Sequence, residues 1–265
     1  MIALVILCVA AVLLLAAMCP WHKPSRKFIP GKYAHRGLHD GNHAENSLEA
    51  FQRAVKAGYG IELDVRLSSD GEVMVFHDDT LLRACGRSER VDTHLAEDLT
   101  SMNIFNTRCR IPTFAQVLET VNGKVPLVVE IKTGGKRQEL CEKTAKMLEA
   151  YNGEYCVESF DPRVLLWFRK NAPNVLRGQL AMNFLRERQE GMPLPLAVLL
   201  TGMLTNFVAR PDFIAYKLDD RHDLPFLLCR KLFLEPAAAW TVRSWDEEKK
   251  SLKLFDAIIF ENFRP

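Results

Sequence analysis

The feature that most constrains the fold of this chain is the regular alternation, from residue 32 onwards, of short apolar runs with amphipathic segments. The apolar runs predict strands over 32–36, 60–66, 125–131, 154–159, 175–180, 213–218, 238–242 and 256–260, and helical periodicity covers 46–58, 113–121, 137–151, 161–171 and 245–254. Consecutive strand–helix units force the strands to run parallel, and eight such units close on themselves. The sequence therefore predicts an α/β fold, a (β/α)8 TIM barrel. A doubly wound open sheet is the alternative, but no G-x-G-x-x-G or Walker sequence follows any candidate strand.

Length and composition favour one globular domain after the N-terminal segment. The chain has 265 residues, 48% of them hydrophobic, and no Gly/Ser-rich linker or internal repeat divides it. We therefore assign residues 32–265 to one barrel domain. The net charge of +2 gives no support to a nucleic-acid partner. The seven cysteines are scattered without the spacing of a zinc site or a disulfide framework, so we expect free thiols and a reducing compartment.

The chain begins with an apolar run, 2–19, that contains no charged residue. As a helix this run would be about 27 Å long, close to the thickness of the hydrocarbon core. It lacks the basic leader of a cleaved signal peptide, and Met18 is larger than the residue expected before a lipidated cysteine. We therefore expect a single-pass transmembrane anchor over 1–21 and a basic juxtamembrane linker over 22–31. From the basic residues after the run, we expect the barrel domain to lie on the cytoplasmic side of the membrane.

One further extended run, 72–77, follows a predicted strand after only Ser69-Asp70-Gly71, too few residues for a helical crossover. This run is therefore expected to fold back as an antiparallel hairpin. A two-residue turn would set His77 opposite Asp64, and a register shifted by one residue is the alternative. In either register the hairpin brings His77 close to the carboxylates of the preceding strand.

Acidic residues lie within two of the apolar strands. Glu62 and Asp64 are two residues apart, so both side chains point to the same face of one strand, and Glu130 lies in the next barrel strand. Carboxylate oxygens are the ligands that Mg²⁺ and Ca²⁺ prefer, so these three acids predict a divalent metal site. The alternative is that they are surface acids at strand edges. Lys132, on the same face as Glu130, either contacts a phosphate oxygen or neutralises the acids.

Two histidines lie where predicted strands end. His35 ends the first strand and His77 ends the hairpin, and catalytic groups of barrel enzymes lie at the carboxyl ends of strands. Two imidazoles can serve as general base and general acid near neutral pH. Arg36 adds a permanent cation beside His35, suited to a phosphate or to one of the acids. Asn46, three residues before Glu49, is interpreted as a structural helix cap.

These motifs, taken in order, resemble the glycerophosphodiester phosphodiesterase family. The resemblance rests on His35-Arg36-Gly37, Glu45-Asn46-Ser47, Glu62-Leu63-Asp64-Val65, Asp70-Gly71 and Val75-Phe76-His77-Asp78, and later on Ile111-Pro112-Thr113, Glu130-Ile131-Lys132, Ser159-Phe160, Trp240-Thr241-Val242 and Ile258-Ile259-Phe260. It covers nearly all of 32–265. The chain departs from the family pattern at Arg243, where Asn is common, and at Glu261-Asn262, where Thr-Asp is usual.

The resemblance implies a phosphoric diester hydrolase that converts glycerophosphodiesters to glycerol 3-phosphate and an alcohol. It implies that His35 and His77 form the acid–base pair, that Glu62, Asp64 and Glu130 bind a divalent cation, Mg²⁺ or Ca²⁺, and that Arg36, Lys132 and Trp240 contact substrate. The departures leave the head group open. A lysophospholipid at the membrane is therefore the alternative substrate, and a non-catalytic module that binds a phosphorylated ligand is the alternative of a different class.

Overall fold

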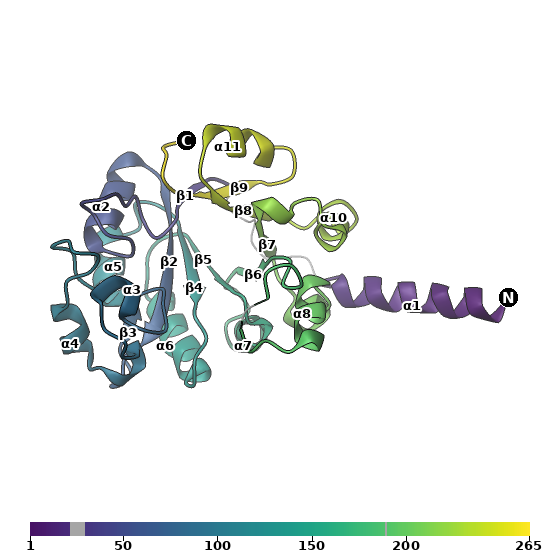
Figure 1. Cartoon of the computed structure of the whole chain (residues 1–265), viewed down its shortest axis with the longest axis horizontal. Coiled ribbons are helices and arrows are strands. Elements are labelled where there is room, and N and C mark those ends of the chain that lie inside the picture. The colour runs from purple at the N-terminus through teal and green to yellow at the C-terminus, as the bar shows by residue number, and fades with distance from the viewer. Residues whose placement is uncertain (22–29, 189) are drawn as a thin grey trace.

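The computed structural model describes residues 1–21, 30–188 and 190–265. Eight parallel strands form a closed barrel with helices around its outside (Figure 1). They are β1 (Lys32–Ala34), β2 (Gly60–Leu67), β4 (Leu127–Ile131), β5 (Tyr155–Ser159), β6 (Arg177–Ala181), β7 (Phe213–Lys217), β8 (Ala237–Val242) and β9 (Ala257–Phe260). The strand β1 pairs with both β2 and β9, which closes the barrel. This confirms the eight predicted strands and excludes the open sheet.

The barrel strands are buried on both faces, because successive side chains point alternately toward the surrounding helices and into the barrel. In β4, Val129 and Ile131 belong to the large core that lies between the strands and the helices, whereas Val128 belongs to a separate cluster inside the barrel. Glu130 has the same parity as Val128. Its carboxylate is therefore carried into the barrel interior, at the carboxyl end of the strand.

The five helices predicted from periodicity are all present, and several short ones were not anticipated. The helices after the N-terminal one are α2 (Leu48–Ala57), α3 (Leu82–Cys85), α4 (Ala96–Ser101), α5 (Phe114–Val121), α6 (Arg137–Glu149), α7 (Pro162–Asn171), α8 (Leu194–Thr201), α9 (Asn206–Ala209), α10 (Leu224–Lys231) and α11 (Trp245–Ser251), with 3-10 turns η1 (Val91–Thr93) and η2 (Leu218–Asp220). The unanticipated helices have four to eight residues, too short for a periodic pattern to define them.

The predicted hairpin is present, but its register differs by one residue from the first of the two alternatives. Strand β3 (Val73–Val75) is antiparallel to β2 and sets Val75 opposite Val65. The N–H of Phe76, rather than of His77, donates to the carbonyl of Asp64 at 3.0 Å. The shift arises because the turn takes three residues, the last of them Gly71 with φ 81°.

A sharp turn after β1 directs the first motif residues into the barrel mouth. Gly37 has φ 84°, and a Cβ at this position would lie 2.9 Å from both Ala50 Cβ and Phe51 Cδ1. We expect Gly37→Ala to lower the free energy of unfolding by about 2–4 kcal/mol, through backbone strain and crowding together. At Gly86, with φ 70° and open space around it, the same change should cost about 1–2 kcal/mol. Denaturant unfolding of the two variants measures the difference, and equal losses would contradict the crowding at Gly37.

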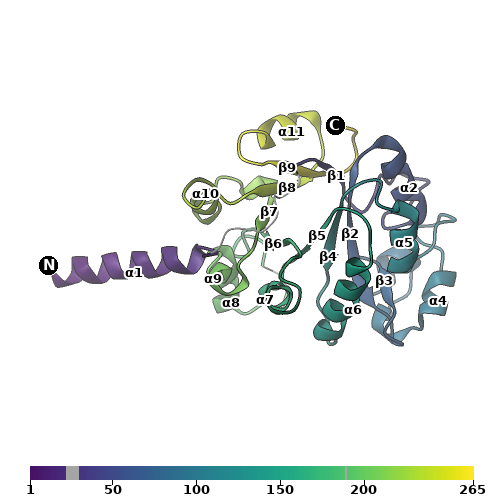
Figure 2. The ribbon, with the colours of Figure 1, turned by 180° about the vertical axis from the view of Figure 1, so that it is seen from behind.

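The N-terminal helix α1 (Ile2–Met18) extends away from the barrel and touches it only near its C-terminal end (Figures 1 and 2). Its last turn packs on α9, and Met18 is buried in the main core. The helix has 17 residues and is therefore about 25 Å long, whereas the hydrocarbon core of a bilayer is about 30 Å thick. Among the described residues, no helix is long and apolar enough to cross a membrane. The transmembrane anchor predicted over 1–21, and membrane attachment through it, are therefore not supported, and 22–29 of the predicted linker lie outside the described residues.

Candidate active site

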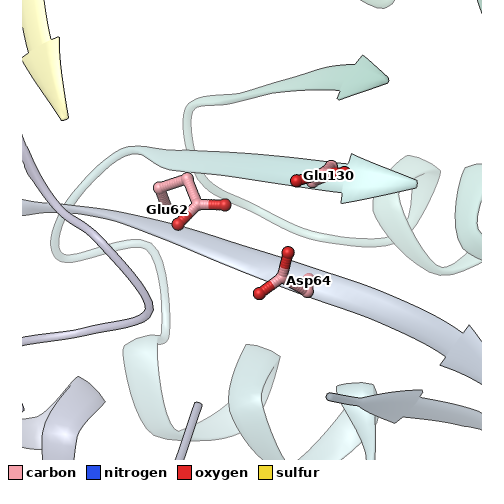
Figure 3. Close-up of side chains that lie close together, drawn as sticks. All are labelled: Glu62, Asp64 and Glu130. Carbon is pink, nitrogen blue, oxygen red and sulfur yellow. The ribbon is translucent and has the colours of Figure 1, made fainter. Parts of the chain in front are cut away.

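Three carboxylates meet inside the barrel at the carboxyl ends of β2 and β4. One oxygen from each of Glu62, Asp64 and Glu130 can be chosen so that all three lie within 4.8 Å of one another. Figure 3 shows Glu62 and Asp64 on β2 beside Glu130 on β4. The pairing of Asp64 with Glu130 across the two strands creates this proximity. All three residues are buried, and such a set of hard oxygen donors could hold a divalent metal ion.

Basic side chains balance part of this negative charge. Lys132 Nζ lies 2.9 Å from Asp64 Oδ1 and 2.7 Å from Glu130 Oε2. Arg36 Nε lies 3.5 Å from Asp64 Oδ2, and its backbone N–H donates to Glu62 Oε2 at 3.0 Å. Of the two roles considered for Lys132, the structure therefore displays the neutralising one.

The acids of the cluster differ in the direction of their pKa shifts. Burial would raise the pKa of Asp64, but nearby cations, Lys132 first among them, hold it well below its usual range. Burial, together with the charge of Asp64, raises the pKa of Glu62 well above its usual range. Within the cluster, the surroundings thus favour the ionised form of Asp64 and disfavour that of Glu62.

Asn46 belongs to this site and is not the helix cap that its sequence context indicated. The cap of α2 is Ser47, whose hydroxyl accepts from Ala50 N–H. Asn46 adopts a left-handed conformation, φ 55°, and donates from Nδ2 to Asp64 Oδ2 at 2.7 Å. The prediction placed the cap one residue too early, which hid the role of the Asn side chain in orienting Asp64.

A fourth buried acid, Glu158 on β5, was missed. It lies opposite Glu130 in the strand pairing and is only 1% exposed. Its Oε2 has no hydrogen-bond partner among the described residues. Burial and the charge of Glu130 raise its pKa well above the usual range. The signal was present in the sequence, because Glu158 occupies the same place in its apolar strand as Glu130 does in β4.

His35 lies directly after β1, facing the acid cluster. Its Nδ1 is 2.7 Å from Glu261 Oε2, and its Nε2 is 3.9 Å from Glu62 Oε2. A carboxylate on Nδ1 fixes the orientation and tautomer of an imidazole and leaves Nε2 for chemistry. Burial lowers the pKa of His35, against the opposing effect of Glu261. The lowered pKa favours the neutral imidazole, which is the form that can accept a proton.

His77 has a similar arrangement on the other side of the site. Its Nδ1 lies 2.5 Å from Asp78 Oδ1, and its side chain is 32% exposed. Asp78 accepts from Arg83 Nε at 2.6 Å, and Arg83 also binds Glu45, which binds Arg36 Nη1 at 2.7 Å. A continuous chain of ion pairs thus joins the surroundings of His77 to the turn that carries His35.

Trp240 lies in β8 beside an aromatic wall. Its ring contacts Phe160 edge to face, with centroids 5.6 Å apart, and Phe160 contacts Phe184 in the same way at 6.0 Å. The indole N–H donates to the carbonyl of Ala215 at 2.9 Å. Trp240 is partly buried and packs against the cluster inside the barrel, so its surroundings suit both a core residue and a wall of a pocket.

The two departures from the family pattern, Arg243 and Glu261, contact each other. Arg243 Nε donates to Glu261 Oε1 at 2.7 Å, while Glu261 Oε2 holds His35. Burial would raise the pKa of Glu261, but the hydrogen bond with His35 and the charge of Arg243 lower it to about 2. Glu261 is thus an ionised residue that positions His35. The sequence analysis had linked this departure from the family pattern only to substrate specificity.

We expect Glu261→Gln to lower kcat by about 10- to 100-fold, because the amide still contacts His35 but no longer stabilises its protonated form. The pH profile of kcat should shift as well, which loss of packing alone would not produce. Steady-state kinetics across pH measures both effects. Glu119→Gln, on the exposed face of α5, is the control and should match the wild type. An unchanged pH profile in Glu261→Gln would contradict the assignment.

Several solved structures share the barrel fold over most of this chain. A phosphodiesterase from Oleispira antarctica, solved in complex with the product sn-glycerol-3-phosphate, matches with a TM-score of 0.71 and 21% identity over 88% of this chain and 93% of that one. A glycerophosphodiester phosphodiesterase from Thermotoga maritima matches with a TM-score of 0.66 and 24% identity over 89% and 96%. At these identities the likeness shows the barrel fold alone.

Curated relatives match about half of the chain. A glycerophosphodiester phosphodiesterase from Caldanaerobacter subterraneus subsp. tengcongensis is 35% identical over 158 residues, 56% of this chain and 65% of the relative. A lysophospholipase D from Homo sapiens is 30% identical over 146 residues, 50% of this chain and 45% of the relative. The chain thus covers slightly less than two thirds of the first relative and less than half of the second.

The family model for the glycerophosphoryl diester phosphodiesterase family matches residues 35–213, more than half of the chain. The matched segment begins at His35 and includes the acid cluster, His77 and Lys132. The chain belongs to the glycerophosphoryl diester phosphodiesterase family.

Proposed function

We propose that this protein hydrolyses glycerophosphodiesters to glycerol 3-phosphate and an alcohol. The observation that carries the proposal is the buried cluster of Glu62, Asp64 and Glu130, with His35 and His77 each held by a carboxylate on Nδ1. The names of the relatives and the product in the Oleispira antarctica structure support the same substrate class.

We propose that the cluster binds one divalent cation, Mg²⁺ or Ca²⁺. Glu62, Asp64 and Glu130 would hold it, and their hard oxygen donors fit either ion. When bound, such an ion polarises a phosphoryl oxygen and stabilises the charge that develops there. Lys132 would then be shared between the acids and a phosphate oxygen, and Arg36, which already contacts Asp64, would offer a second cation to the phosphate.

The two histidines would move the protons of the reaction. His35 Nε2 takes the proton from the attacking oxygen, a glycerol hydroxyl or water, and His77 Nε2 gives a proton to the alcohol as its bond to phosphorus breaks. If the glycerol hydroxyl attacks, this step leaves a cyclic glycerol phosphate, which water then opens to glycerol 3-phosphate with the two histidines in exchanged roles. Glu261 and Asp78 hold the two imidazoles through Nδ1 and stabilise their charged forms. The exchanged assignment of base and acid uses the same contacts. Trp240 and Phe160 would form a wall for the part of the substrate beside β8.

The proposal is tested by assaying the purified chain against glycerophosphocholine and glycerophosphoglycerol with added Mg²⁺ or Ca²⁺. Release of glycerol 3-phosphate, detected by a coupled dehydrogenase, is the expected result. Binding of a diester with no turnover under any metal would instead favour a non-catalytic module.

A second candidate substrate is a lysophospholipid, and two observations favour it. The human relative is named a lysophospholipase D, and the aromatic wall of Trp240, Phe160 and Phe184 is apolar enough to lie beside an acyl chain. Comparing kcat/KM for lysophosphatidylcholine and glycerophosphocholine separates the two. A higher value for the lysolipid would make it the preferred substrate.

We also propose that the protein functions in a reducing compartment. All seven cysteines are free, and Cys109, Cys141, Cys156 and Cys229 are buried. Titration of the denatured protein, isolated from its own host without reductant, should find seven thiols, and fewer would contradict the proposal.

A further inference from the structure

We propose that a basic cleft beside Lys132 binds a negatively charged group on the alcohol part of the diester, so that the preferred substrates are glycerophosphodiesters with an anionic head group. This inference rests on the proposed hydrolysis and adds the class of substrate.

The cleft lies at the barrel mouth between the end of β2, the η1 segment and the loop that joins β4 to α6. It encloses about 90 Å³. Five basic side chains line it, Arg66, Arg90, Lys132, Lys136 and Arg137, against the two acids Asp79 and Asp92. A cleft with this balance of charge attracts anions.

The cleft is continuous with the candidate active site. Lys132 belongs to both, because its Nζ contacts Asp64 and Glu130 while its side chain also lines the cleft. On the opposite side, Arg66 donates from Nε and Nη2 to the carbonyl of His77, at 2.8 and 2.7 Å. The cleft therefore begins next to His77, which we assign to protonate the leaving alcohol. The head group of a bound diester would lie at this point.

The basic groups are only partly neutralised by protein acids. Arg66 pairs with Asp79 at 2.5 Å, Arg90 with Asp92 at 2.9 Å and Arg137 with Asp161 at 3.7 Å. Lys132 is shared between Asp64 and Glu130. Lys136 makes no ion pair within the described part of the chain, and its Nζ donates only to the carbonyl of Ser69 at 3.3 Å. Lys136 can therefore pair with an anion that enters the cleft without first losing a carboxylate partner.

The size of the cleft argues for a compact group. One water needs roughly 10–15 Å³ of such volume, so about 90 Å³ accepts a phosphate or carboxylate with some of its water but not an acyl chain. The loop residues Gly134 and Gly135 line this space, and a Cβ on either would meet no atom within 4 Å. Neither glycine has a positive φ, so side chains can be added there without backbone strain.

Two substrates that differ by one phosphate test the proposal. We compare kcat/KM for glycerophosphoinositol 4-phosphate and glycerophosphoinositol, and expect the wild type to favour the phosphorylated substrate by at least about tenfold. Gly135→Asp should lower this ratio about tenfold relative to Gly135→Asn, which has the same shape without the charge. The Asn variant also controls for folding, since both replace the same glycine.

A second pair of variants uses neighbouring arginines. Arg90→Glu should lower the ratio, whereas Arg87→Glu should leave it at the wild-type value, because Arg87 lies outside the cleft and pairs with Glu89. Hydrolysis of both substrates with equal efficiency would overturn the inference and leave the proposed function intact. Failure to hydrolyse these two substrates, glycerophosphoglycerol and glycerophosphocholine would overturn the proposed function itself.

Discussion

Replacing either His35 or His77 by Ala is expected to lower kcat by about 10²–10⁴-fold, the usual contribution of a positioned general acid or base. Each imidazole has its Nδ1 occupied by a carboxylate, from Glu261 or Asp78, so each presents one nitrogen to the barrel mouth. Glycerol 3-phosphate release under saturating glycerophosphodiester and metal measures the loss.

The fold should survive both histidine substitutions, because neither imidazole lies in a hydrophobic cluster of the barrel. Thermal unfolding by circular dichroism checks this. His222→Ala, on an exposed loop, is the matched control and should keep wild-type activity. Full activity in both His35→Ala and His77→Ala would contradict the acid–base assignment.

Removal of divalent metal is expected to lower activity by at least about 100-fold, because several kcal/mol of charge stabilisation at the phosphoryl group would be lost. The buried donor set of Glu62, Asp64 and Glu130 is the reason for this expectation. Dialysis against a chelator, followed by addition of Mg²⁺ or Ca²⁺ separately, measures the loss and identifies the ion that restores turnover.

Asp64→Asn should show the same loss even with metal added. Asp64 contacts Lys132, Arg36 and Asn46 at once, so its charge organises the cluster. Asp98→Asn, an exposed acid in α4, is the control and should respond to metal as the wild type does. Unchanged activity after chelation, with metal loss verified by elemental analysis, would rule out metal dependence.

The barrel was predictable because its signals are local. Each strand is a short apolar run, and acids placed two residues apart, such as Glu62 and Asp64, reveal which face points inward. The hairpin register was less certain because it depended on turn length. Ser68 bonds through its hydroxyl to both Asp70 and the backbone of Glu72, which stabilises the longer turn that sequence spacing did not distinguish.

Other features of the site depended on contacts across the barrel, which a single sequence does not reveal. Glu261 meets His35 only because β9 pairs with β1. The membrane span predicted for the N-terminal helix is not supported, for a different reason. Hydropathy alone predicted a span, whereas in the structure the helix ends at Met18, whose side chain is buried in the main core.

The contact between Glu261 and His35 joins residues 226 positions apart in the chain. His35 is therefore oriented by a residue that directly follows β9, the strand that closes the barrel against β1, so a chain in which β9 has not yet paired would carry an unoriented imidazole. Turnover during refolding should accordingly reach its full rate only once β9 has paired with β1, so that full enzymatic activity becomes a kinetic marker of ring closure.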